Sequence, residues 1–182
     1  MLHQNDNSLL DQYSPSGKVP VLMDGDTKIW ESLAIGEYLA ERYPEKQLWP
    51  KDTLARALAR SISSEMHAGF MNLRKNMPMN CKAKLPGKGM GPGVQEDINR
   101  IQSIWSECRN VYGAAGKFLF GRFMVPDAMF APVVVRFSVY DVKLDSAARE
   151  YRDTILSLPA MQEWIGEARA EKELIPELEV QK

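Results

Sequence analysis

The stretch GKVPVLMDGDTKIWESLAIGEYLAERYP, residues 17–44, decides the fold of the N-terminal part of this chain. The apolar runs VPVLM and TKIW flank Asp24-Gly25-Asp26, and an Asp-Gly pair between such runs is a strong signal for a β-hairpin. Ser32 can cap the segment that follows, whose apolar residues recur at helical spacing until Pro44 stops the helix. The stretch therefore predicts two antiparallel strands followed by one helix.

The sequence on either side of this stretch is predicted to be almost entirely helical. A short helix precedes it from Ser8 to Tyr13, and a long amphipathic helix follows from Thr53 to about Met77. Residues 78–93 contain four glycines and three prolines, so we expect a loop there. Beyond the loop, helical spacing of apolar residues predicts helices over about 98–112, 126–142, 146–157 and 160–170.

The composition excludes several classes of protein. The 182 residues are 45% apolar and 26% charged, which is the usual globular range. A net charge of −1 argues against a concentrated positive surface for nucleic acid or an anionic membrane. The longest apolar run, 128–135, is far shorter than the ~20 residues that span a bilayer. Cys81 and Cys108 lack metal-site spacing, so we expect no metal, no disulfide framework and a reducing cytoplasm.

Two short motifs in residues 17–44 are candidate binding elements. Pro20 lies in a strand-like run and is either an edge-strand proline or part of a cis Val19-Pro20 bond, and the spacing alone favours the edge strand. Glu31 and Ser32 lie at the strand-to-helix junction, where the helix dipole favours a carboxylate and an acid can hold an amine. The pair either grips the zwitterionic end of an amino acid or is a plain N-cap with an acidic neighbour, which is the commoner case.

Four segments taken together resemble the glutathione transferases: SPSGKVPVL, WESLAIGEYLAERYP, FLFGRFMVPDAMFAPVV and LPAMQEWI. The resemblance covers nearly the whole chain. It implies an α+β, mostly α fold, with a partial thioredoxin-like domain over residues 1–46 and an all-α bundle over residues 47–182. In the family the first domain binds glutathione and the second supplies a pocket for a hydrophobic co-substrate. The resemblance also implies a homodimer.

The same resemblance implies roles for five residues in glutathione binding. The backbone of Val19 would pair with the cysteinyl part of glutathione, beside a cis Pro20. Glu31 and Ser32 would hold the γ-glutamyl end. Lys18 would lie near the glycyl carboxylate, although an exposed lysine is more commonly just solvated.

The first helix of the bundle carries the candidate co-substrate residues. Met66 and Phe70 lie on one apolar stripe, with His67 and Arg74 beside it. The stripe is either a helix-packing face, which is the usual case, or one wall of a hydrophobic pocket. In the second case Arg74 or His67 would contact a polar substituent of a small electrophile.

Asp127 is expected to have a structural role. The family begins a helix here with a Ser or Thr cap and an Asp three residues later, and Met124 stands at the cap position in this chain. Asp127 therefore keeps half of a capping box.

In the family, a strand, a helix and a second strand precede the segment that corresponds to Ser8–Ser14. A βαβ unit takes roughly 30 residues, and thirteen precede Ser14 here, so we expect the unit to be absent from this sequence. The family's catalytic Ser, Tyr or Cys follows the first of those strands, so no residue is assigned a catalytic role. Three functions stay open: transfer of glutathione to a small hydrophobic electrophile, a noncatalytic dimerising scaffold, and a zeta-like glutathione-dependent isomerase.

Overall fold

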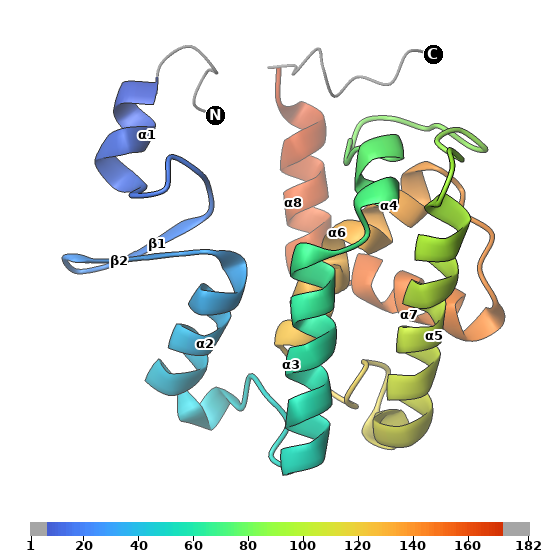
Figure 1. Ribbon diagram of the computed structural model, residues 1–182, viewed down its shortest axis with the longest axis horizontal. Helices are drawn as coiled ribbons and strands as arrows, with labels where there is room; N and C mark the ends of the chain where they lie inside the picture. The colour runs from blue at the N-terminus through green and yellow to red at the C-terminus, as the bar shows by residue number, and fades with distance from the viewer. Residues whose placement is uncertain (1–6, 173–182) are drawn as a thin grey trace.

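A computed structural model describes residues 7–172 as one small β-hairpin among helices. Figure 1 shows the N-terminal elements, in blue, on one side of the molecule and the helical bundle on the other. The predicted mostly α fold is confirmed, while a domain boundary at residue 46 stays a prediction. The elements are α1 (Asn7–Tyr13), β1 (Val21–Asp24), β2 (Thr27–Trp30), α2 (Ser32–Arg42), α3 (Thr53–Ala68), α4 (Met71–Asn76), α5 (Val94–Tyr112), α6 (Val125–Val139), α7 (Ser146–Leu156) and α8 (Pro159–Ala170).

The predicted hairpin is confirmed. Strands β1 and β2 pair antiparallel with Asp24 opposite Thr27, which leaves a two-residue loop at Gly25-Asp26. Within residues 7–172 the sheet consists of these two strands. The Tyr38 hydroxyl on α2 donates a hydrogen bond to Asp24 Oδ2 at 2.6 Å, so the tip of the hairpin is tied to the following helix.

Two expectations at the ends of these strands are wrong. The edge-strand position that the spacing favoured for Pro20 is wrong, because Pro20 lies just before β1. The Val19-Pro20 bond is cis, which confirms what the family resemblance implied. Ser32 is not the cap of α2, because Glu31 is the N-cap residue and Ser32 is already helical. The chain turns between β2 and α2 at Glu31, whose φ of 68° lies in the left-handed region.

The single helix expected from Thr53 to Met77 is wrong, since α3 ends at Ala68 and α4 begins at Met71. At Gly69 the backbone packs so closely on the preceding turn that a Cβ would lie 2.6 Å from the Glu65 carbonyl oxygen. Only glycine accepts that approach. Phe70 then takes a left-handed conformation and starts α4 in a new direction.

Helix α6 is the centre of the bundle, and most of its residues are buried. The Trp105 ring on α5 packs against Phe130 and Phe137 of α6 and Tyr151 of α7, with ring centroids 5.9, 5.5 and 4.8 Å apart. Such aromatic contacts add to the stabilisation from buried apolar area. No helix in the part of the chain that the structure describes is long and apolar enough to cross a membrane.

Asp127 is completely buried at the start of α6 and has the structural role expected from the sequence. Its Oδ2 accepts a hydrogen bond from the Met124 N–H at 2.9 Å, which is the expected half of the capping box. Its Oδ1 accepts hydrogen bonds from the Leu119 N–H at 3.1 Å and the Tyr151 hydroxyl at 3.0 Å. One carboxylate thus joins α6, α7 and the loop before α6.

The N-terminal elements meet the bundle where α2 packs on α6. A Cβ at Gly36 would lie 3.1 Å from Val125 Cγ1, so a glycine here allows the two helices to approach closely. The guanidinium of Arg60 on α3 donates to both carboxylate oxygens of Glu37 on α2, at 2.8 and 3.0 Å. These contacts hold α2 beside the bundle and thereby position the residues at the start of α2.

Candidate ligand-binding cleft

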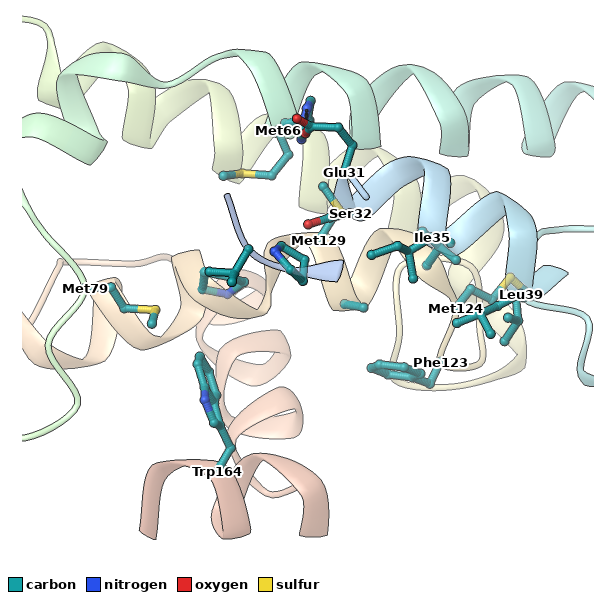
Figure 2. Close-up of a pocket in the computed structure, with 18 of the residues that line it drawn as sticks. Glu31, Ser32, Ile35, Leu39, Met66, Met79, Phe123, Met124, Met129 and Trp164 are labelled. Carbon is teal, nitrogen blue, oxygen red and sulfur yellow. Dashed lines mark ion pairs between the residues drawn. The ribbon is translucent and has the colours of Figure 1, made fainter. Parts of the chain in front are cut away.

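A cleft of about 700 Å³ lies between the N-terminal elements and the bundle. Its volume falls in the range of about 300–1,000 Å³ that is usual for small-molecule sites. Helices α2, α3, α4, α6 and α8 all contribute to its lining, and Figure 2 shows their side chains converging from several sides. Methionine is prominent in the lining, and its flexible side chain adapts to apolar ligands of different shape. The apolar residues labelled there include Ile35, Leu39, Met66, Met79, Met124 and Met129.

Of the five residues expected to bind glutathione, Val19, Pro20, Glu31 and Ser32 line this cleft. Lys18 is exposed and is not part of the lining. The Ser14 hydroxyl fixes the segment before Val19, because Ser14 Oγ accepts from the Lys18 N–H at 3.0 Å and donates to the Lys18 carbonyl at 2.6 Å. Among residues 7–172 none forms a hydrogen bond with the backbone of Val19 itself, which is therefore able to pair with a peptide-like ligand.

Glu31 and Ser32 lie together on one wall of the cleft, at the start of α2 (Figure 2). The Glu31 carboxylate does not cap the helix but lies 3.2 Å from His67 Nε2 on α3. Exposed contacts of this kind are worth only about 0–1 kcal/mol, so the ammonium group of a ligand can compete with His67 for Glu31. The first-turn amides of α2 and the Ser32 hydroxyl are suited to bind a carboxylate.

The structure brings three of the four expected co-substrate residues into the same cleft. Met66, His67 and Arg74 line it, while Phe70 does not. Phe70 is 7% exposed and belongs to the hydrophobic core. Because the chain changes direction between α3 and α4, Phe70 does not continue the face of α3 that carries Met66.

Sequence reasoning missed Arg136 on α6, which also lines the cleft. Its Nε donates to the Met77 carbonyl at 2.9 Å and its Nη1 to the Pro132 carbonyl at 3.2 Å. Burial, with a smaller effect from the nearby charge of Arg74, lowers the pKa of Arg136 to about 10. The sequence did contain one signal for Arg136. This residue directly follows the longest apolar run of the chain, and a charged residue next to a buried segment is a candidate for a site.

The cleft offers few groups for covalent or metal chemistry. Ser32 is the one hydroxyl side chain among its described lining residues, and neither cysteine lines it. Burial raises the pKa of the Cys81 thiol, which disfavours the reactive thiolate. Residues 7–172 contain no group of three His, Cys, Asp or Glu side chains placed to hold a metal ion.

Residues 1–47 match the family model for the N-terminal domain of glutathione S-transferases. The chain is 27% identical to a probable maleylacetoacetate isomerase of Caenorhabditis elegans over 164 residues, which cover 88% of this chain and 75% of that protein. It is 53% identical to glutathione S-transferase 1 of Dianthus caryophyllus over 125 residues, which cover 67% of this chain and 55% of that protein. A glutathione transferase homologue from Burkholderia, solved with bound glutathione, superposes with a TM-score of 0.65 at 23% identity, covering 89% of this chain and 78% of that one.

These similarities extend over both parts of the fold. The family model covers the hairpin and α2, and an alignment of 164 residues necessarily extends through most of the bundle. The superposition shows that the hairpin and the bundle are arranged as in a solved structure of this fold. The chain therefore belongs to the glutathione transferase family.

Proposed function

We propose that this protein binds glutathione along Val19, Glu31 and Ser32 and transfers it to a small hydrophobic electrophile held in the cleft. One observation carries the proposal: residues suited to glutathione and residues suited to an apolar co-substrate line the same cleft. The binding of glutathione by the Burkholderia homologue supports the proposed glutathione site. The apolar lining of the cleft supports a hydrophobic electrophile as the co-substrate.

Each part of glutathione has a matching group on the wall formed by β1 and α2. The γ-glutamyl carboxylate would bind the Ser32 hydroxyl and the first-turn amides of α2, and the ammonium would bind Glu31. The Val19 backbone would pair with the cysteinyl amide. This orientation directs the thiol toward the apolar part of the cleft, where Met66 and Met129 lie.

In the proposed transfer the sulfur of glutathione forms a bond to an electrophilic carbon. The leaving group departs with its bonding electrons, and the thiol proton passes to water. Free thiols have a pKa near 8.5, so the reaction needs a group that favours the thiolate. No residue of 7–172 is assigned that role.

We further propose that the protein forms a homodimer and that it works in the cytoplasm. Cys81 and Cys108 are both free thiols, in keeping with a reducing compartment.

Turnover tests the proposal directly. With 1-chloro-2,4-dinitrobenzene as the electrophile, we expect a rate of thioether formation above the uncatalysed rate that saturates with glutathione. The absorbance of the conjugate measures this rate. A protein that binds glutathione but leaves the rate at background would contradict the transferase and favour a noncatalytic scaffold.

A glutathione-dependent isomerase is the second candidate, favoured by the nematode relative and by two arginines in the cleft. In this reaction the thiolate adds to a cis double bond, the resulting single bond rotates, and elimination returns glutathione and the trans product. Conversion of maleylacetone to its trans isomer, followed by absorbance, would distinguish the two activities. The isomerase predicts conversion that requires glutathione but does not consume it.

A further inference from the structure

We propose that Met79 and Met129 are sites of reversible oxidation by hydroperoxides, and that their conversion to methionine sulfoxide weakens the binding of apolar molecules in the cleft. The inference rests on the proposed function for the identity of the natural ligand. The modification itself can be tested with an apolar probe and without glutathione.

Thioether sulfur is concentrated around the cleft. Four methionines of the described chain share a place in its lining: Met66, Met79, Met124 and Met129. They come from α3, from the loop after α4, from the N-cap of α6 and from α6 itself. Figure 2 shows the Met66 and Met79 side chains reaching into the cleft. An oxidant that enters the cleft therefore meets thioether sulfur on several walls.

The four methionines differ in their exposure to solvent. Met66 and Met124 are buried, with exposed fractions of 2% and 7%. Met79 and Met129 are half-buried, and each packs part of its side chain against the hydrophobic core. Because a hydroperoxide must reach the sulfur atom, the half-buried pair is the one open to oxidation.

The two thiols of the chain are poor competitors for the oxidant. Cys108 is 1% exposed, and burial raises the pKa of its thiol to about 12. Burial also raises the pKa of the Cys81 thiol. The thiolate is the reactive form of cysteine, so both side chains are held in the less reactive state. Neither of them lines the cleft, so their oxidation would not alter its surface.

The oxidation step transfers one oxygen atom to the methionine sulfur. The sulfur lone pair attacks an oxygen of the hydroperoxide, an S–O bond forms and the O–O bond breaks. Sulfur loses two electrons and the peroxide gains them. After proton transfer the products are the sulfoxide and water, or an alcohol when the oxidant is an organic hydroperoxide. Methionine sulfoxide reductases reverse the change, with one enzyme for each sulfoxide epimer.

A sulfoxide changes what this surface can bind. The thioether of methionine is apolar and adapts to the shape of a ligand, whereas the sulfoxide carries a polar oxygen. An apolar ligand that covers this oxygen removes it from water without offering a hydrogen bond, which is unfavourable. We therefore expect such a ligand to bind about tenfold more weakly after oxidation. Glutathione should be affected far less, because its charged γ-glutamyl end is assigned to Glu31 and Ser32.

Calorimetry with 2-naphthalenemethanol, a neutral apolar probe, tests the proposal. The wild-type chain is titrated before and after treatment with hydrogen peroxide, which catalase then removes. We expect the affinity for the probe to fall about tenfold. Peptide mass spectrometry should locate sulfoxide at Met79 and Met129. A mixture of both methionine sulfoxide reductases with dithiothreitol should restore the affinity, whereas dithiothreitol alone should not, because it reduces oxidised thiols but not sulfoxides.

Two double variants show which methionines matter. Met79→Leu/Met129→Leu should keep its own affinity for the probe after peroxide, because leucine has a similar volume and no sulfur to oxidise. Met71→Leu/Met90→Leu is the matched control, since Met71 and Met90 are 65% and 51% exposed and lie outside the lining. This control should lose affinity as the wild type does. Should the first variant fail to fold by circular dichroism, each single replacement carries the test and should lose less affinity than the wild type.

Three results would overturn the proposal. The first is a wild type whose affinity for the probe survives peroxide treatment, whether or not Met79 and Met129 are oxidised. The second is a Met79→Leu/Met129→Leu variant that loses as much affinity as the wild type. The third is a wild type that does not bind 2-naphthalenemethanol before treatment, since there would then be no apolar site for oxidation to change.

Titration with glutathione separates this inference from the proposed function. If glutathione does not bind, while the affinity for the probe falls on oxidation and returns on repair, the proposed function fails and the oxidation sites stand. If glutathione binds, while oxidation leaves the affinity for the probe unchanged, the oxidation sites fail and the glutathione site stands.

Discussion

Replacing Ser32 with alanine is expected to weaken the binding of glutathione at least tenfold. The Ser32 hydroxyl lies in the cleft at the start of α2, where the ligand's γ-glutamyl carboxylate would accept its hydrogen bond. A hydrogen bond to a charged group contributes about 1.5–3 kcal/mol, and 1.4 kcal/mol corresponds to a factor of ten in the dissociation constant. Calorimetric titration of the variant with glutathione measures the loss.

Ser61→Ala is the matched control for that substitution. Ser61 is exposed on α3, where its hydroxyl donates to the Ala57 carbonyl at 3.0 Å within the same helix. Glutathione affinity should be unchanged in this variant. Equal dissociation constants for wild type, Ser32→Ala and Ser61→Ala would show that the ligand carboxylate binds elsewhere.

Replacing Asp127 with alanine is expected to lower the free energy of unfolding by about 3–5 kcal/mol at neutral pH, since unpaired buried donors cost about 1–3 kcal/mol each. The substitution leaves the buried N–H groups of Leu119 and Met124 without their acceptor. The Tyr151 hydroxyl, also buried, loses its partner as well. Chemical denaturation followed by circular dichroism measures the change.

The free energy of unfolding that Asp127→Ala loses should also depend on pH. Burial raises the pKa of Asp127 to about 6 from its usual 3.8, so the folded state holds this proton more tightly than the unfolded state. The titration therefore contributes stability that is present at low pH and is lost as the pH rises to about 6. The difference between wild type and Asp127→Ala should be larger near pH 4 than at pH 7, by up to about 3 kcal/mol. A difference that stays constant over this range would contradict the raised pKa.

Local sequence patterns were sufficient for most of the secondary structure. The hairpin around Gly25 follows from one turn signal between two β-rich runs, and the helices of the bundle follow from the period of their apolar residues. The same patterns could not find the break between α3 and α4. A period of 3.6 continues through Gly69, and the close approach of Gly69 to Glu65 is visible only in three dimensions.

The residues on the glutathione side of the cleft were easier to predict from the sequence than those on the co-substrate side. Glu31 and Ser32 are neighbours in the chain, so a strand followed by a helix places them together without any knowledge of the tertiary structure. The cis bond before Pro20 needed the family resemblance, because spacing alone favoured an edge strand.

The co-substrate side depends on contacts between distant elements. Phe70 and Arg136 are separated in the chain by helices α4 and α5 and the loops that follow them. Only the packing of the bundle places Phe70 in the core and Arg136 in the lining of the cleft. The apolar run before Arg136 signalled a buried helix, but it did not say which cavity a charged residue at its end would reach. Tertiary packing decides such assignments.

Titration of the wild-type chain with glutathione in a calorimeter tests most directly that this cleft is a glutathione site. We predict saturable binding of one glutathione per chain, displaced by S-hexylglutathione. No heat of binding at millimolar glutathione, from a chain that circular dichroism shows to be folded, would contradict the assignment of Val19, Glu31 and Ser32.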